Sequence, residues 1–465
     1  MDLLLTHGYF LYEDAKELQI MKPYPPLGIL YLCSHLRQKG FNVEVFDSTF
    51  SSREQLFEQL QQEPPSVLGI YANLGTRPNV VEILRRAKET GWQTVVGGPE
   101  PATYIDEYIE AGADVVVVGE GEVTLEELIP VLRSRSTDML DHIAGIAFRS
   151  PDGRIIQTEA RKQIQHIDAQ AWPAREAIDI TRYFDAWHKH HGMSSMSLIT
   201  TRGCPYRCRW CSHMQVFGRT HRRRSPVSVA NELESLIERY HPDIAWIADD
   251  VFPIHPGWLF QYASEVKHRG LRLPFECTSR ADRISPQVAD ALAEMGCFRV
   301  WIGSESGSQR ILDAMERGVT VEQVQTTVAL CRSRGIQCGI FLMWGYEGEE
   351  ISDIETTIEH VKNSDPDVFL TTVAYPMKGT PYFSEVAGRI ENLKPWGIGT
   401  GRDVRVRGRH SRGFYKFADQ LLRSEVELKQ LRNKPTPDPV AIAQLGSRIS
   451  DFRAGLYASV SEVEA

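Results

Sequence analysis

The 465-residue chain has few of the features that mark special classes of protein. No apolar run approaches the roughly 20 residues needed to cross a bilayer, so we expect no membrane span. Glu13 and Asp14 come too early for a secretory signal peptide, and the expected location is therefore the cytoplasm. The chain also has no internal repeat and no low-complexity tract. These absences argue against membrane-spanning, secreted and repeat classes.

An excess of basic residues is missing as well. Lys and Arg number 52 against 61 Asp and Glu, which gives a net charge of −9. The Trp and Tyr residues are spread too evenly to mark a base-stacking platform. We therefore expect no nucleic-acid partner, although a local basic patch remains open. With 42% hydrophobic and 24% charged residues the chain is typical of a soluble globular protein.

Only eight cysteines are present, and in a reducing compartment they are thiols or metal ligands before they are disulfides. Cys204, Cys208 and Cys211 form a CxxxCxxC loop that begins at Gly203. Three thiolates on one tight loop can each bind one iron of a cubane cluster, which leaves the fourth iron open to a small-molecule chelate. The alternative is zinc, which would need a fourth ligand such as His213.

Apolar runs alternate with helical patterns over residues 1–139, which predicts a Rossmann-like domain with a parallel sheet covered on both faces. Residues 140–195 predict a linker with a hairpin at Pro151–Gly153. Alternation resumes over 196–385, where six β/α units predict a partial (β/α)6 barrel. Residues 386–465 are expected to form a small helical C-terminal region. The fold class is therefore α/β throughout.

The cysteine loop, with Trp210 before its last cysteine and a strand before it, resembles that of the radical S-adenosylmethionine (SAM) superfamily. The resemblance implies a [4Fe–4S] cluster on Cys204, Cys208 and Cys211, SAM on the open iron, and reductive cleavage of SAM to a 5′-deoxyadenosyl radical. It also implies SAM contacts after the successive barrel strands. The residues concerned are Trp210, Asp249, Asp250, Ser279, Arg280, Gly303 and Glu305.

The first domain resembles the cobalamin-binding domain that precedes the barrel in Mg-protoporphyrin ester cyclases and cobalamin-dependent radical SAM methyltransferases. Glycines at its strand ends leave room for a large flat macrocycle. One departure stands out: in the D-x-H-x-x-G motif, Thr49 replaces the cobalt-binding His and Ser52 replaces the Gly. The cobalamin contacts that the resemblance implies are Tyr71, Asn73, Gly97, Gly98, Pro99, Gly119, Glu120, Gly121 and Glu122.

The resemblance predicts a cobalamin-dependent radical SAM enzyme that transfers a methyl group to an unactivated carbon or phosphorus centre of a small-molecule substrate. Such an enzyme needs a reductant such as flavodoxin or ferredoxin. Two alternatives remain: radical oxidation, cyclisation or ring contraction without methyl transfer, and a non-catalytic cobalamin or redox sensor. A first domain that no longer binds cobalamin is also open. The sequence names no substrate.

Overall fold

The computed structural model describes residues 1–212 and 214–464, with the side chains at 137, 214 and 215 excepted, so His213 lies outside the described residues. The chain divides into two compact units. The first unit comprises residues 1–205, 212–246 and 392–403, and the second comprises residues 206–211, 247–391 and 404–465. No helix of the described chain is long and apolar enough to cross a membrane.

The first unit contains a seven-stranded sheet with the strand order β2-β1-β3-β4-β5-β6-β7. The first five strands are parallel, and the hairpin β6–β7 adds antiparallel to β5. The hairpin predicted from the turn at Pro151–Gly153 thus extends this sheet instead of standing in a linker. The strands are β1 (Leu3–His7), β2 (Val43–Val45), β3 (Val67–Tyr71), β4 (Gln93–Gly97), β5 (Val115–Val117), β6 (Ile146–Arg149) and β7 (Ile155–Gln157).

Two hydrophobic clusters lie on opposite faces of this sheet because successive strand residues point to opposite sides. Leu3 and Leu5 belong to one cluster, and Leu4 belongs to the other. The continuous apolar strands therefore form a doubly covered sheet, as predicted from their composition. The helices of residues 1–191 are α1 (Ala15–Ile20), α2 (Leu27–Gln38), α3 (Arg53–Gln62), α4 (Arg77–Glu89), α5 (Ile105–Glu110), α6 (Glu122–Ser134) and α7 (Ile180–His191), with short 3-10 turns η1 (Leu11–Glu13), η2 (Pro101–Thr103), η3 (Thr137–His142), η4 (Ile167–Ala169) and η5 (Arg175–Ala177).

A second sheet follows the order β8-β11-β12-β13-β14-β15, and the division between the units falls within β11. β12 to β15 are parallel, and helices alternate with them in the order that the β/α pattern predicted. The strands are β8 (Ser195–Leu198), β11 (Ile244–Ile247), β12 (Phe275–Ser279), β13 (Cys297–Glu305), β14 (Gln337–Trp344) and β15 (Val368–Val373), and a small hairpin pairs β9 (Thr201–Arg202) with β10 (Arg222–Arg223).

Three helices of this part begin directly after a Ser or Thr that caps them. Ser225, Ser285 and Thr320 each accept a backbone N–H of the first turn. The elements are α8 (Met214–Phe217), α9 (Pro226–Tyr240), α10 (Pro256–His268), η6 (Ala281–Arg283), α11 (Pro286–Glu294), α12 (Gln309–Ala314), α13 (Val321–Arg332) and α14 (Ile351–Ser364).

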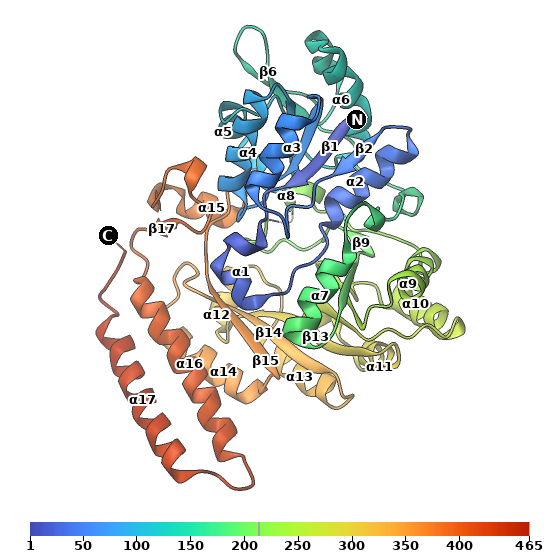
Figure 1. Ribbon diagram of the computed structural model, residues 1–465. Coiled ribbons are helices and arrows are strands. Elements are labelled where there is room, and N and C mark those ends of the chain that lie inside the picture. Colours follow the sequence, from blue (N-terminus) through green and yellow to red (C-terminus); the bar gives the residue numbers. More distant parts are fainter. Residues whose placement is uncertain (213, 465) are drawn as a thin grey trace. The chain divides into compact units, whose positions relative to one another are not determined.

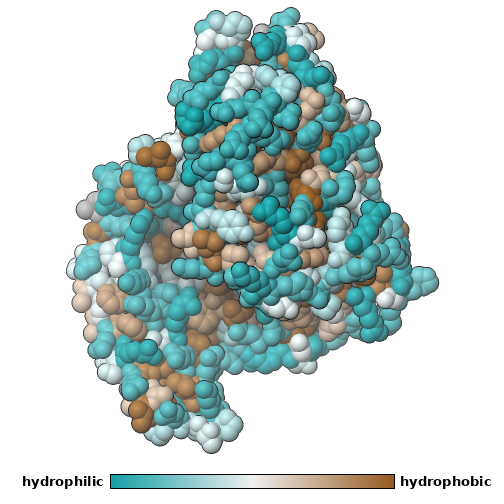
Figure 2. All heavy atoms as spheres, in the orientation of Figure 1, coloured by the Kyte–Doolittle hydropathy of each residue, from teal (hydrophilic) through white to brown (hydrophobic). Residues whose placement is uncertain are grey.

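The C-terminal residues form more helix than the sequence predicted. The polar tail contains a second long helix, which Asp438 caps and Pro439 begins. It runs beside α16 (Arg412–Arg432) as a helical hairpin (Figure 1), over which the surface shows apolar and hydrophilic side chains intermixed (Figure 2). Val440 and Tyr457 are exposed apolar residues of this second helix. The elements are α15 (Pro381–Val386), η7 (Ala387–Arg389), β16 (Ile390–Asn392), η8 (Trp396–Ile398), β17 (Val404–Val406), α16 (Arg412–Arg432) and α17 (Pro439–Ala458).

Candidate functional site

The carboxyl edge of the first sheet carries the residues predicted to contact cobalamin. The strand order places its switch point between β1 and β3, which is where ligands bind in open parallel sheets. Gly98 has a φ of +118°, and a Cβ there would lie 2.3 Å from the carbonyl oxygen of Ala72. Gly119 has a φ of +97°, and a Cβ there would meet nothing within 4 Å. The edge is therefore tightly packed beside β3 and open beside β5.

Two of the predicted residues next to Gly98 have different surroundings. The Tyr71 ring lies 3.1 Å from where a Gly98 Cβ would be, so the structure brings these two positions together. Asn73 instead stabilises the turn in which it lies, because its side-chain oxygen accepts the N–H of Gly75 ahead of α4. Gly97, Gly98 and Pro99 are all half-buried at the end of β4.

The two glutamates after β5 face other protein groups. Glu120 accepts from Arg202 at 2.8 Å, from Arg222 at 2.7 Å and from the N–H of Ile164 at 2.8 Å. Glu122 pairs with Arg202 at 2.5 Å. Burial works against the charge, but these hydrogen bonds hold the pKa of Glu120 below its usual value. Since Arg202 stands two residues before Cys204, these carboxylates hold the strand that leads into the cysteine loop.

The segment with Thr49 in place of the cobalt-binding His is closed by protein contacts. Thr49 is buried and shares the hydroxyl of Tyr183 with Asp47. The nearby His7 accepts the N–H of Tyr9 on Nδ1 and faces the Asp47 carboxylate with Nε2 at 3.2 Å. Both of its nitrogens therefore have partners. Despite burial, hydrogen bonds from His7 and Tyr183 keep the pKa of Asp47 below its usual value.

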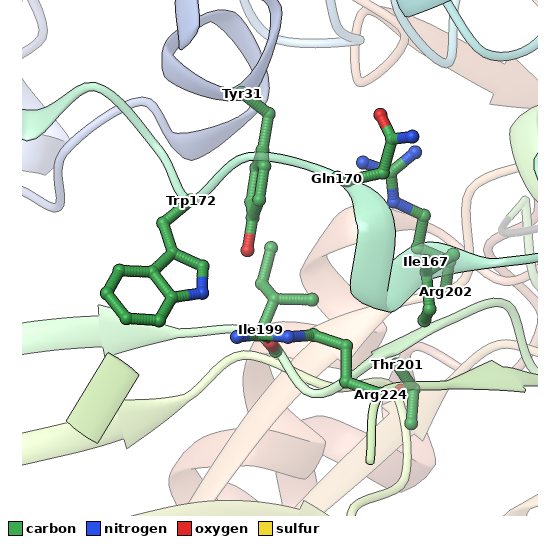
Figure 3. Close-up of a pocket in the computed structure, with 8 residues that line it drawn as sticks. All are labelled: Tyr31, Ile167, Gln170, Trp172, Ile199, Thr201, Arg202 and Arg224. Atoms are coloured by element: carbon green, nitrogen blue, oxygen red, sulfur yellow. Dashed lines mark hydrogen bonds between the residues drawn. The ribbon is translucent and has the colours of Figure 1, made fainter. Parts of the chain in front are cut away.

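A small cavity lies near the start of the second sheet, still within the first unit. Tyr31 from α2 and Trp172 point toward Ile199 and Arg224 (Figure 3). The cavity measures about 10 Å³, which is room for one water molecule at most. Burial raises the pKa of the Tyr31 hydroxyl above its usual value. This cavity is too small for any of the predicted cofactors.

In the second unit, Arg280 follows β12 and is buried with one donor to spare. Its Nε donates to Asp282 at 2.8 Å and one Nη to the carbonyl of Gly318 at 3.1 Å, whereas the other, Nη1, has no hydrogen-bond partner. Its guanidinium lies 3.7 Å from the centre of the Tyr206 ring. The neighbouring Ser279 hydroxyl donates to the carbonyl of Arg280. A fixed, buried cation with an unused N–H is suited to a carboxylate ligand.

Gly303 and Glu305 end β13 beside Arg317. The β13–β14 register shifts here, and Glu305 adopts a φ of +61° that strains a non-glycine residue. Arg317 donates to the carbonyl of Gly303 at 2.9 Å and lies 3.6 Å from the Glu305 carboxylate. A Cβ on Gly303 would collide with both side chains, at 2.5 and 2.6 Å. Burial raises the pKa of Glu305, and Arg317 and Arg280 oppose that rise.

The three cysteines of the loop are all free thiols. Cys204 is buried in the first unit, whereas Cys208 and Cys211 are half-buried in the second. Trp210 packs against the apolar cluster that contains Met315 and Met343. In the part of the chain that the structure describes, no three Cys, His, Asp or Glu side chains converge as the ligands of one metal ion. The assignment of cluster ligands therefore rests on the sequence motif.

The two aspartates after β11 differ in exposure. Asp249 is buried, and Asp250 is exposed. The Phe252 N–H that follows them donates to the carbonyl of Thr278 next to Ser279 and Arg280, so this loop packs at the end of β12. The second unit thus gathers most of the residues predicted to contact SAM at the carboxyl ends of its parallel strands.

Two further residues belong to this neighbourhood, and the sequence pattern did not single them out. Tyr206 stands inside the cysteine loop and packs on Arg280, so its position in the motif was the available signal. Arg317 follows the short helix α12, 12 positions after Glu305, and no spacing rule marks it. Only the folded chain brings its guanidinium to Gly303 and Glu305.

Comparison with known families identifies both domains. The profile of the Radical SAM superfamily matches residues 198–361, and that of the B12 binding domain matches residues 19–129. The chain therefore contains a B12 binding domain followed by a radical SAM domain. This radical SAM enzyme therefore uses a [4Fe–4S] cluster and SAM, and its B12 binding domain takes cobalamin. Enzymes of this kind act on small-molecule substrates and need a reductant.

Three relatives illustrate the similarity. The radical SAM enzyme is 29% identical to an uncharacterised methyltransferase of Pyrococcus horikoshii over 367 residues, and the matched region covers 77% of each chain. It is 24% identical to the anaerobic magnesium-protoporphyrin IX monomethyl ester cyclase of Rubrivivax gelatinosus, over 80% of this chain and 68% of that one. The radical SAM methyltransferase TsrM of Kitasatospora setae, solved with cobalamin and a [4Fe–4S] cluster, shares the fold at a TM-score of 0.70, with 21% identity over 86% of this chain and 78% of that one.

The residues of the radical SAM enzyme fit two of these cofactors on direct observation. The unpaired Nη1 of Arg280 provides a buried donor for the SAM carboxylate. The open space at Gly119 leaves room for a flat macrocycle at the sheet edge beside β5.

Proposed function

We propose that this chain is a cobalamin-dependent radical SAM methyltransferase that acts on an unactivated carbon or phosphorus centre. The observation that carries the proposal is the joining, in one chain, of a B12 binding domain to a radical SAM domain. Removal of a hydrogen atom alone needs no cobalt. The similarity to an uncharacterised methyltransferase and the fold shared with TsrM support this choice.

Under this proposal, Cys204, Cys208 and Cys211 hold three irons of the cluster. SAM lies among Trp210, Asp249, Asp250, Ser279, Arg280, Gly303 and Glu305, and cobalamin lies against the sheet edge at Tyr71, Asn73, Gly97, Gly98, Pro99, Gly119, Glu120, Gly121 and Glu122. When bound, these groups supply a one-electron reductant, a radical source and a methyl carrier.

The protein side chains bind SAM and orient it. Arg280, fixed by Asp282 and Gly318, turns its free N–H toward the carboxylate of SAM. Tyr206 covers the Arg280 guanidinium and keeps water from that ion pair. Gly303 leaves the space that Glu305 and Arg317 occupy.

The first experiment measures cofactor content. Anaerobically purified protein is expected to carry about four irons per chain and one cobalamin, and to release 5′-deoxyadenosine from SAM under reduction. Cys204→Ala, Cys208→Ala and Cys211→Ala should each lose cluster iron and SAM cleavage together. Cys297→Ala, which removes a buried thiol outside the loop, should keep both. Wild-type iron and cleavage in all three loop variants would refute the radical SAM assignment of the loop.

The second experiment measures products with the true substrate. Methyl transfer uses two SAM per turnover and should give S-adenosylhomocysteine and 5′-deoxyadenosine in equal amounts. The similarity to the Rubrivivax cyclase favours the second candidate, oxidation or cyclisation without methyl transfer. That reaction would give 5′-deoxyadenosine without S-adenosylhomocysteine. A sensor would retain cobalamin and cleave no SAM.

The electron donor in this proposal is a small low-potential protein, a flavodoxin or a ferredoxin, and the site of action is the cytoplasm. The donor is tested by reducing the cluster with each purified protein in turn and following its electron paramagnetic resonance (EPR) signal. A cluster that accepts electrons from neither protein would contradict the proposal that a flavodoxin or a ferredoxin is the electron donor.

A further inference from the structure

Arg317 contacts a thiol of the cysteine loop. Its Nη1 lies 4.0 Å from the Sγ of Cys208, within hydrogen-bonding reach of a sulfur. The two residues are 109 positions apart in sequence but belong to the same unit. Arg317 is 5% exposed, so its charge is held away from bulk water. The buried Arg317 guanidinium therefore lies next to the sulfur of one predicted cluster ligand.

Two contacts orient this guanidinium, and a third anchors the Arg317 backbone. Nη2 donates to the carbonyl of Gly303 at 2.9 Å, and Nε faces the Glu305 carboxylate at 3.6 Å. The Arg317 backbone N–H donates to Leu312 at the end of α12. A Cβ on Gly303 would displace the head group, because it would lie 2.6 Å from Nη2. The side chain is therefore held by Gly303 and Glu305 on an anchored backbone.

A positive hydrogen-bond donor beside a ligand sulfur stabilises the cluster state that carries one more electron. Hydrogen bonds to the sulfurs and local charge are among the factors that set the potential of iron–sulfur clusters. We propose that Arg317 is a positioning residue that raises the reduction potential of the [4Fe–4S] cluster by donating to the Cys208 sulfur. The proposal rests on the proposed function, since it takes Cys208 as a ligand; the electron comes from the external one-electron donor.

The main alternative for a buried arginine here is binding of SAM. Arg280 has an unpartnered Nη1 for that purpose. In Arg317 the two Nη nitrogens face Cys208 and Gly303, and Nε, which makes no hydrogen bond, lies 3.6 Å from the Glu305 carboxylate. The two roles predict different measurements. Loss of a SAM contact weakens SAM binding, and loss of a sulfur contact changes the potential of the cluster even without SAM.

The test compares Arg317→Gln and Arg317→Lys with wild type and with Arg209→Gln. Arg209 is a matched control because it lies between two loop cysteines, yet its side chain pairs with Glu316 and Glu385. Each protein is reconstituted anaerobically, its iron is counted, and the cluster is titrated by EPR without SAM. For Arg317→Gln we expect at least a tenfold loss in the equilibrium constant for reduction, a fall of about 59 mV. Arg317→Lys should fall less, and Arg209→Gln should match wild type.

An unchanged or higher potential in a fully assembled Arg317→Gln protein would overturn the proposal. So would an equal shift in Arg209→Gln, because charge anywhere in the loop would then explain it. If Arg317→Gln assembles no cluster, Arg317→Lys decides, and a potential at or above wild type in that variant contradicts the proposal. Absence of a cluster from wild-type protein would instead refute the proposed function.

Discussion

At the residue scale, the site in the second unit depends on one position where no side chain fits. Gly303 lies under Glu305 and Arg317, and Glu305 takes a left-handed backbone conformation to reach that place. Such strained conformations persist where the surrounding packing imposes them, and they gather at binding sites. A methyl group on Gly303 would therefore disturb the site more than the fold.

Gly303→Ala should weaken equilibrium binding of SAM at least tenfold, because the added Cβ would push Glu305 and Arg317 out of place. Isothermal titration with a non-cleavable SAM analogue measures this. Gly257→Ala is the control, since a Cβ at that helical position meets nothing within 4 Å. Equal affinity in the two variants would contradict the prediction.

A second residue-scale feature links β13 to α14. His360 is buried, and its Nε2 lies 2.9 Å from the hydroxyl of Ser304. Burial lowers the pKa of His360 to about 4, against 6.5 for an exposed imidazole. The unfolded chain therefore binds one more proton than the folded chain between these values. The stability that the buried, neutral His360 contributes is fully present above pH 6.5 and is lost as the pH falls toward 4.

We expect the wild-type free energy of unfolding to fall by about 2 kcal/mol more than that of His360→Gln between pH 7.5 and pH 5. Denaturant unfolding of the apoprotein at the two pH values measures the difference. His268→Gln, at an exposed position of α10, should keep the wild-type dependence. The same pH dependence of the free energy of unfolding in wild type and His360→Gln would show that burial does not lower the pKa of His360.

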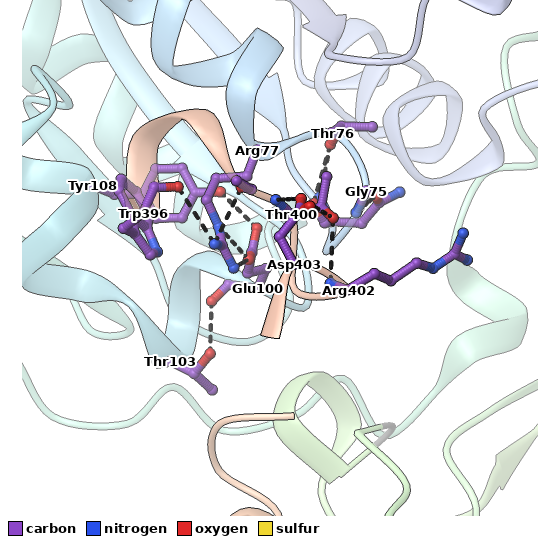
Figure 4. A network of polar contacts seen from close by, with 12 residues as sticks. Gly75, Thr76, Arg77, Glu100, Thr103, Tyr108, Trp396, Thr400, Arg402 and Asp403 are labelled. Carbon is purple, nitrogen blue, oxygen red and sulfur yellow. Dashed lines mark hydrogen bonds and ion pairs between the residues drawn. The ribbon is translucent and has the colours of Figure 1, made fainter. Parts of the chain in front are cut away.

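At the element scale, residues 392–403 complete the first unit although they follow the second sheet in sequence. Arg77 at the start of α4 donates to the carbonyls of Trp396 and Gly399 and pairs with the buried Glu100 (Figure 4). The Trp396 ring packs edge-on against Tyr108 at 4.9 Å. This segment therefore covers the end of β3 and β4 next to the edge where cobalamin is proposed to bind.

Trp396→Ala should loosen this segment, because the ring contributes about 2 kcal/mol of packing on Tyr108 and Arg77. Hydrogen exchange of the amides in 392–403 should then be about 30-fold faster, which is the same free energy expressed as an equilibrium constant. The Gly401 N–H, which donates to Leu74, is one such amide. Ile398→Ala, at a 65% exposed position, should leave the rates unchanged. Wild-type exchange in Trp396→Ala would contradict this account of the packing.

At the scale of the whole molecule, the sheet edge proposed to bind cobalamin has, among the described strand residues, no His at the motif position that binds cobalt. Thr49 stands where the ligand His would be, and Tyr183 and Asp47 close that segment. The nearby His7 has partners on both nitrogens. The domain therefore has the space for a corrinoid but no imidazole aimed at it from these strands.

Bound cobalamin should accordingly be base-off, with no protein nitrogen on its lower face. EPR of the cob(II)alamin form reads this directly, through the absence of nitrogen hyperfine splitting on the cobalt signal. His7→Gln provides the control and should give the same spectrum. A lower-face nitrogen signal that His7→Gln removes would show that this side chain leaves its partners to bind cobalt.

The sequence by itself determined the parallel sheets and the cysteine motif, because both follow from local pattern. Apolar strands, strand-end glycines and capped helix starts depend on neighbours a few residues away. The hairpin at Pro151–Gly153 was also visible as a turn. The polar residues beyond Arg432 concealed α17, because this helix has little amphipathic pattern of its own and packs along α16.

The tertiary structure decided which charged groups are available to a ligand. In sequence, Glu120 and Glu122 resemble ligand contacts as much as Arg280 does, yet the fold pairs both glutamates with Arg202 and leaves an N–H of Arg280 free. It also brought Arg317 to Cys208 across 109 positions. Ion pairs and buried donors depend on distances of about 3–4 Å between residues remote in the chain, and no periodicity of the sequence encodes those distances.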